Sequence, residues 1–214
     1  MRIFSLKSYI KLTLQFGLTL YKYQILKNIA IFASGSGTNA ENIIRYFRTS
    51  SLGKVRLVLC NRPDAGVLIR AKNTDIQSVI FNKTEFYESD KILNILLSHK
   101  IDLVVLAGFL WLVPGNLLKT FQGRMINIHP ALLPAYGGKG MYGDKVHKEV
   151  INNHEKESGI TIHFVNEQYD EGDILFQARC KIVEGESAES LAKKIHELEY
   201  KYFPSVIEDL LNRI

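Results

Sequence analysis

The chain has 214 residues, of which 46% are hydrophobic and 23% are charged, and it contains two cysteines. This composition is typical of a globular protein that can bury a core, and it excludes a disordered chain, a collagen-like repeat and a disulfide-rich miniprotein. The formal net charge is +5, but five of the basic residues lie within residues 1–27, which contain no acidic residue. Residues 28–214 are therefore neutral, without the basic excess typical of nucleic-acid-binding proteins.

The first 27 residues are basic and apolar, as many targeting segments are. Their longest stretch without Lys or Arg, residues 12–21, is too short to span a bilayer. No alanine precedes Ala30, so the A-x-A cleavage pattern of secretory signals is missing. We therefore predict that residues 1–27 are an N-terminal extension outside the fold, with a surface anchor or targeting role as the alternative, and that residues 28–214 form one domain.

The cysteines, Cys60 and Cys180, lie far apart in the sequence, each within an apolar run. Buried, reduced thiols of this kind are typical of proteins kept in a reducing compartment. We therefore expect a cytoplasmic protein without stable membrane association and without a disulfide.

Apolar runs with the pattern of strands alternate with helical patterns along the chain. Strands are predicted, in chain order, at residues 28–33, 55–59, 78–81, 103–107, 125–129, 160–165 and 174–183. Helices are predicted at residues 39–47, 63–72, 86–97, in the turn after Pro114, at 145–152, and from the Ser187 cap to about Arg213 with an interruption near Pro204. A glycine-rich loop is expected at 134–143. This order predicts an α/β fold: a single doubly wound domain with a mostly parallel twisted sheet, which binds ligands at the carboxyl ends of its strands.

A glycine-rich loop, Ser34-Gly35-Ser36-Gly37-Thr38-Asn39, follows the first predicted strand. Glycines permit a tight turn, and the free N–H groups at the start of the next helix attract an anion. No Gly-Lys-Ser/Thr follows, so this is not a Walker loop. The spacing also fits G-x-G-x-x-A, and Arg62 can contact a 2′-phosphate, so an NADP site is the alternative reading.

An apolar bend with the only tryptophan, residues 106–114, follows the fourth predicted strand. An apolar surface beside an anion site suits a flat heteroaromatic ring, although a purely structural core is the alternative.

Asn127 and His129 are two apart on the fifth predicted strand, so their side chains share a face. An amide beside an imidazole can stabilise an oxyanion and move a proton. The acidic turn 166–173 can supply a carboxylate that favours the imidazolium form of His129, the alternative being a solvated turn.

Several chemistries lack their sequence signatures. No G-x-S-x-G elbow is present, neither cysteine has a neighbouring histidine, and no H-E-x-x-H spacing occurs among the six histidines. We therefore predict an enzyme without a bound metal.

Taken together, the motifs resemble those of the phosphoribosylglycinamide formyltransferase family, the folate-dependent formyltransferases of purine synthesis. The resemblance rests on G-S-G-T-N at 35–39, L-A-G-F at 106–109, I-N-I-H-P-A-L-L-P at 126–134 and Y-D-E-G at 169–172. It covers residues 28–214. It implies transfer of a formyl group from 10-formyltetrahydrofolate to the amine of glycinamide ribonucleotide, with these two small molecules as partners, no nucleic acid, and a homodimer as one option.

The resemblance also implies roles for individual residues. Asn127, His129 and Asp170 would be catalytic, with Asp170 keeping His129 protonated and Asn127 donating a hydrogen bond to the formyl oxygen. The substrate-binding residues would be Gly35, Ser36, Gly37, Thr38, Asn39, Gly108 and Glu199. The folate would be bound by Phe109, Leu110, Trp111, Leu112, Asn127 and Lys83. Lys83 is the nearest basic candidate for an arginine that the family carries near the folate tail, and the glycine-rich segment 137–144 departs from the family's P-G-x-H pattern.

Four other functions remain open. Methionyl-tRNA formyltransferases share the catalytic trio but carry a further C-terminal domain, and formyltetrahydrofolate hydrolases carry an N-terminal regulatory domain. An NADP oxidoreductase would use the glycine loop and Arg62 but leaves Asn127 and His129 without a role. A binding protein without catalytic activity would hold both ligands without turnover.

Overall fold

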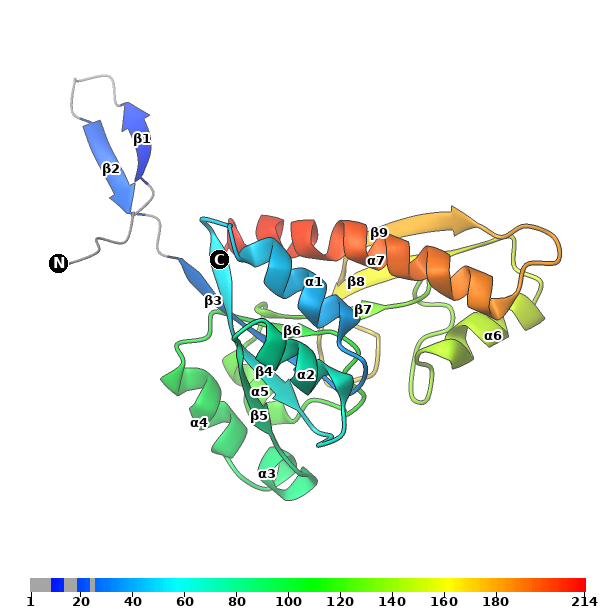
Figure 1. Ribbon diagram of the computed structural model, residues 1–214, viewed down its shortest axis with the longest axis horizontal. Coiled ribbons are helices and arrows are strands. Elements are labelled where there is room, and N and C mark those ends of the chain that lie inside the picture. Colours follow the sequence, from blue (N-terminus) through cyan, green and yellow to red (C-terminus); the bar gives the residue numbers. More distant parts are fainter. Residues whose placement is uncertain (1–8, 14–18, 24–25) are drawn as a thin grey trace.

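A computed structural model describes residues 9–13, 19–23 and 26–214 (Figure 1). Two short strands, β1 (Tyr9–Thr13) and β2 (Thr19–Tyr23), pair antiparallel with each other in a two-stranded sheet of their own. Much of the predicted extension lies outside the described residues, so its role remains a prediction. Lys27 is the first residue of the first strand in the main sheet.

The main sheet has seven strands in the order β5-β4-β3-β6-β7-β8-β9. Their bounds are β3 Lys27–Ala33, β4 Gly53–Cys60, β5 Gln77–Ile80, β6 Leu103–Leu106, β7 Met125–His129, β8 Glu157–Phe164 and β9 Ile174–Lys181. The strands from β5 to β7 are parallel, whereas β8 and β9 are antiparallel to their neighbours. The predicted α/β class and mostly parallel sheet are confirmed.

Helices cover both faces of this sheet (Figure 1). Their bounds are α1 Thr38–Phe47, α2 Gly66–Asn73, α3 Lys83–Tyr87, α4 Lys91–Ser98, α5 Gly115–Thr120, α6 Asp144–Asn152 and α7 Ala188–Leu211. Alternate residues of β3 enter different core clusters: Ile29 and Ile31 pack with α1, α2, α6 and α7, whereas Ala30 and Phe32 pack with α3, α4 and α5. This alternation gives one buried core on each face, as expected for a doubly wound sheet.

Three helix predictions were wrong in detail. The helix expected from Pro63 begins at Gly66, because the chain first makes a turn. The helix expected at 86–97 is two helices, since a capping box between Asn82 and Glu85 starts α3 early and the chain breaks before α4.

The predicted interruption at Pro204 is also absent, because α7 continues through this residue. Proline has no N–H to donate to the carbonyl of Tyr200. The side-chain amide of Asn42 donates to that carbonyl instead, at 2.9 Å. A neighbouring helix therefore satisfies the group that the proline leaves free.

The carboxyl ends of β3, β6 and β7 lie side by side, so the segments that follow them meet at one edge of the sheet. Ser34 joins two of these ends: its backbone N–H donates to the carbonyl of Gly108 at 3.0 Å, and its hydroxyl accepts from the N–H of Leu110 at 3.1 Å. Within the described ranges, none of the helices has the length and apolarity that a membrane crossing requires.

Candidate active site

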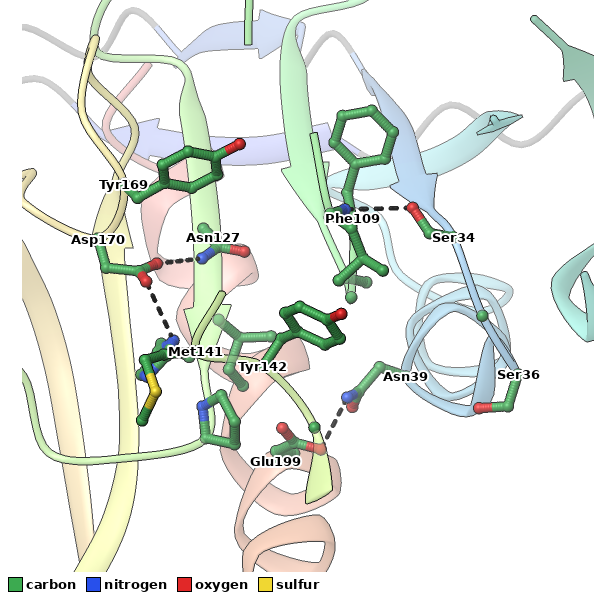
Figure 2. A pocket seen from close by; sticks show the side chains of 18 of the residues that line it. Ser34, Ser36, Asn39, Phe109, Asn127, Met141, Tyr142, Tyr169, Asp170 and Glu199 are labelled. Carbon is green, nitrogen blue, oxygen red and sulfur yellow. Dashed lines mark hydrogen bonds and ion pairs between the residues drawn. The ribbon is translucent and has the colours of Figure 1, made fainter. Parts of the chain in front are cut away.

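A cavity of about 540 Å³ opens at this edge of the sheet (Figure 2). Most of the predicted site residues line it: Gly35, Ser36, Gly37, Thr38, Asn39, Gly108, Phe109, Leu110, Asn127, His129, Asp170 and Glu199. Figure 2 shows Asn127 and Asp170 on one side and Ser36 and Asn39 on the other. Segments from five parts of the chain therefore converge on one cavity.

The glycine loop ends at Gly37, which caps α1 in the left-handed region with φ of 78°. A Cβ atom at this position would lie 2.5 Å from the Cβ of Val67 in α2. Arg70, also in α2, donates from Nε to the carbonyl of Ser36 at 2.9 Å. The loop is thus held against α2, with the start of α1 directed at the cavity, an arrangement that suits an anion.

Replacing Gly37 by alanine is expected to destabilise the protein by about 2–4 kcal/mol, because alanine is strained at positive φ and its Cβ would overlap Val67. Urea unfolding monitored by circular dichroism measures this difference. Gly35→Ala is the matched control, since a Cβ at Gly35 has no heavy atom within 4 Å. Equal midpoints for the two variants would contradict the close packing of Gly37 on α2.

Asp170 joins the predicted catalytic side chains. Its Oδ1 accepts from Asn127 Nδ2 at 3.4 Å, and its Oδ2 lies 3.4 Å from His129 Nδ1. The Oδ2 atom also accepts from the backbone N–H of Gly138 at 2.9 Å. Asp170 itself has a φ of 59°, an uncommon conformation for a residue other than glycine. The acidic turn is therefore ordered around this carboxylate and is not simply solvated.

The protonation state of His129 differs from the expectation. Burial of this imidazole lowers its pKa, and it outweighs the Coulomb attraction of Asp170 and the hydrogen bond to Tyr136, which raise it. Its Nε2 lies 2.7 Å from the carbonyl of Tyr136, which can only accept, so the proton of the neutral ring is on Nε2. Burial of the ring therefore opposes the expectation that Asp170 keeps His129 protonated, and in the neutral ring Nδ1 is the nitrogen without a proton, facing Asp170 Oδ2 at 3.4 Å.

A residue that the sequence reasoning missed, His163 of β8, completes this cluster. Its Nδ1 donates to the carbonyl of Phe164 at 2.8 Å, so its Nε2 accepts from Asn127 Nδ2 at 3.1 Å. Both N–H bonds of the Asn127 amide therefore have partners, His163 and Asp170. Donation from Asn127 to a formyl oxygen requires the ligand to replace the longer contact, that with Asp170.

The charge on Asp170 is stabilised by this environment. Burial raises the pKa of Asp170, but positive charge on the His163 imidazole 3.6 Å away or on the His129 imidazole, together with the N–H of Gly138, lowers it below its usual value. Asp170 is thus an ionised carboxylate with an exposed side-chain fraction of only 11%. A buried anion of this kind can stabilise an imidazolium that forms during a reaction.

The segment expected to bind folate divides between two places. Phe109 and Leu110 line the main cavity, whereas Trp111 and Lys83 line a neighbouring depression together with Phe81. The Lys83 Nζ lies 5.9 Å from the centre of the Trp111 ring. Leu112 lines neither space, and its carbonyl accepts from the Tyr87 hydroxyl. A flat ring can therefore contact Phe109 and Leu110, while Trp111 and Lys83 lie outside the cavity.

The opposite end of the cavity is built from α1 and α7. Glu199, buried in α7, accepts from Asn39 Nδ2 at 2.8 Å and lies 2.9 Å from His196 Nδ1. The bond to Glu199 raises the pKa of His196. The predicted loop residues 138–143 and the unpredicted His147 and His196 complete the wall. Among the described residues, no cluster of three or more His, Cys, Asp or Glu side chains is arranged to hold a metal ion.

The fold and these motifs match known proteins. A family model described as formyl transferase matches residues 27–207. A chloroplastic phosphoribosylglycinamide formyltransferase from Arabidopsis thaliana is 40% identical over 85% of this chain and 64% of its own length. A phosphoribosylglycinamide formyltransferase from Bacillus subtilis is 37% identical over 87% of this chain and 95% of its own length. The chain thus spans less than two thirds of the plant relative but nearly all of the bacterial one.

A crystal structure of glycinamide ribonucleotide transformylase 1 from Geobacillus kaustophilus agrees with these matches. It superimposes with a TM-score of 0.79 at 35% identity, covering 87% of this chain and 100% of that one. The chain therefore belongs to the formyl transferase family, in the branch of the phosphoribosylglycinamide formyltransferases.

Proposed function

We propose that this protein transfers the formyl group of 10-formyltetrahydrofolate to the primary amine of 5-phosphoribosylglycinamide. The products are formylglycinamide ribonucleotide and tetrahydrofolate, in the de novo synthesis of purines. One observation carries the proposal: a glycine-lined anion site, an apolar wall and an amide–imidazole–carboxylate cluster share a single cavity.

The cavity supports the binding of both reactants side by side. The N–H groups at the start of α1 suit the ribose phosphate, and Glu199 suits the ribose hydroxyls. Phe109 and Leu110 suit the pterin ring of the folate. Holding an amine and a formyl group together in the correct orientation supplies roughly several kcal/mol of the barrier reduction.

The neutral resting state of His129 supports its role as the proton acceptor. The substrate amine attacks the formyl carbon, and the carbonyl oxygen becomes negative in the tetrahedral intermediate. The attacking nitrogen gives its proton to the free Nδ1 of His129, and Asp170, 3.4 Å away, stabilises the resulting imidazolium. Asn127 donates one N–H to the oxyanion in place of its long contact with Asp170. The oxyanion then re-forms the carbonyl group as the bond between carbon and the folate nitrogen breaks. That nitrogen takes up the proton held by the His129 imidazolium, which returns to its neutral form, and both products are released.

The binding partners and the cellular location of the protein follow from the same proposal. Its partners are the two small-molecule reactants, and it acts without a metal ion, nucleic acid or membrane. Cys60 and Cys180 are both free thiols, and burial raises the pKa of each, which suits a reducing compartment such as the cytoplasm. Cell fractionation with an antibody against the protein tests this location.

Incubation of the purified protein with 10-formyltetrahydrofolate and one of three acceptors tests the reaction. The acceptors are glycinamide ribonucleotide, initiator methionyl-tRNA and water, and tetrahydrofolate formation is followed by absorbance. We expect turnover only with the ribonucleotide. Tetrahydrofolate formation with the tRNA or with water alone would assign the cavity to a different acceptor.

A further inference from the structure

His163 in β8 is a buried histidine that lies behind the catalytic cluster. Its ring is 2% exposed, and the residue does not line the main cavity. Its Nε2 atom lies 3.1 Å from Asn127 Nδ2 and 3.6 Å from Asp170 Oδ1. An imidazole in this place can affect a reaction in the cavity only through the side chains that it contacts.

The backbone determines which nitrogen of the His163 ring carries the proton. Nδ1 lies 2.8 Å from the carbonyl oxygen of Phe164, which can only accept, so the proton is on Nδ1. In the neutral ring, Nε2 then has a free lone pair and accepts from the amide of Asn127. A second proton on Nε2 would set two donors against each other, so this contact selects the neutral ring.

The strand pairing holds the His163 ring beside Asn127. The two residues lie opposite each other in the antiparallel register of β7 and β8. Strand β8 is itself paired on its other side with β9, so it is not an edge strand. Side chains opposite each other in such a pair are direct neighbours. The acceptor nitrogen is therefore fixed in position by the sheet and does not depend on a mobile loop.

An asparagine amide needs such a fixed partner, because a half-turn of the amide exchanges its oxygen and its nitrogen in almost the same volume. One N–H of Asn127 donates to His163, and the other donates to Asp170 Oδ1 at 3.4 Å (Figure 2). When a formyl oxygen replaces the contact with Asp170, the bond to His163 remains. The reversed amide would instead present its own oxygen to the oxyanion, and the two oxygens would repel each other.

We propose that His163 is a positioning residue: its Nε2 accepts one N–H of Asn127 and thereby directs the other N–H at the oxyanion that forms during formyl transfer. This inference rests on the proposed function and assigns to β8 a part in the chemical step. It also limits the effect of His163, since a residue that acts through Asn127 cannot contribute more than Asn127 itself.

Steady-state kinetics of two variants test this role. His163→Asn keeps a donor near the position of Nδ1 and removes the acceptor at Nε2, whereas His163→Gln places an amide oxygen near the position of Nε2. We expect His163→Asn to lower kcat by about tenfold, the effect of one lost hydrogen bond, and His163→Gln to recover most of this loss. KM for both substrates should stay unchanged, because the ring lies outside the cavity and the oxyanion forms only in the reaction.

A double-mutant cycle tests whether His163 acts through Asn127. Asn127→Ala alone should lower kcat by about 10²–10³-fold, as the loss of an oxyanion donor does. Adding His163→Asn to this variant should lower kcat no further, because the side chain that His163 positions is already missing.

Ser158→Ala is the matched control in the same strand. Ser158 is 3% exposed, its hydroxyl has no hydrogen-bond partner among the described residues, and it does not line the cavity. Its loss should leave kcat unchanged, which separates the role of His163 from a general effect of removing a buried polar group from β8.

Nitrogen-15 NMR of the wild-type protein tests the hydrogen bond without any substitution, so it also decides if a variant does not fold. We expect a proton on Nδ1 of His163 and none on Nε2. A proton on Nε2, an unchanged kcat in folded His163→Asn, a glutamine variant as slow as the asparagine variant, or a further loss in the double mutant would each overturn the assignment. A wild-type protein that forms no tetrahydrofolate with glycinamide ribonucleotide would instead overturn the proposed function, before any variant is measured.

Discussion

Replacing His129 by alanine is expected to lower kcat by about 10²–10⁴-fold, the usual contribution of a positioned acid–base group. The ring is the only side chain of the catalytic cluster that combines a free nitrogen with a pKa below its usual value, so no neighbour replaces it. His163 lies close by, but its Nε2 accepts from Asn127. Steady-state kinetics with both substrates measure the change, and KM should vary little because the proton moves only in the reaction itself.

His99→Ala is the matched control for this experiment. His99 follows α4, bonds to Gln77 and does not line the cavity. Its loss should leave kcat unchanged. Near-normal turnover by a folded His129→Ala variant would remove the imidazole from the mechanism and transfer the proton to another acceptor.

The sequence predicted the elements that carry strong local signals. Apolar runs located β3, β6 and β7, because strands buried on both faces are hydrophobic along their length, and alternation located β8. The errors arose where distant residues decide the outcome. Proline alone predicts a break at Pro204, but Asn42 from another helix satisfies the carbonyl that the proline leaves free. Local propensity contains no information about such a contact.

The same distinction applies to the site. Residues two apart on one strand share a face, which was enough to bring Asn127 and His129 together. His163 was missed because its role depends on the antiparallel register of β7 and β8, in which it lies opposite Asn127. Had this pairing been known, the alternation in Ile160–Val165 would have located it.

Protonation was harder to predict than position. A carboxylate beside an imidazole favours the imidazolium, and the acidic turn does supply Asp170. The outcome depends on how far the ring is buried, and the side chain of His129 is only 4% exposed. Sequence patterns do not give burial at this precision. We therefore propose that His129 is not a resident cation but a base that becomes charged during the reaction.

Asp170→Asn tests this changed role most directly, and we expect it to lower kcat by about 10²-fold or more. Asparagine tolerates the φ of 59° at this position, so the turn should keep its conformation. The variant loses the charge that stabilises the imidazolium of His129 and the hydrogen bond from Gly138 to a second carboxylate oxygen. Unfolding measurements report the stability lost with the hydrogen bond from Gly138. The fall in kcat reports the lost charge, because only the charge acts on the acid–base chemistry.

The pH profile of kcat shows in which direction Asp170→Asn shifts the pKa of His129. In the wild type, His129 must be neutral to accept a proton, so kcat falls as the pH drops through the pKa of His129. Asp170 stays ionised over this range, because the pKa of Asp170 lies below its usual value. Asp170 raises the pKa of His129. Its removal must therefore lower that pKa further and move the acidic limb of the profile to lower pH. A limb that stays in place or moves to higher pH in the asparagine variant would mean that His129 does not accept the proton.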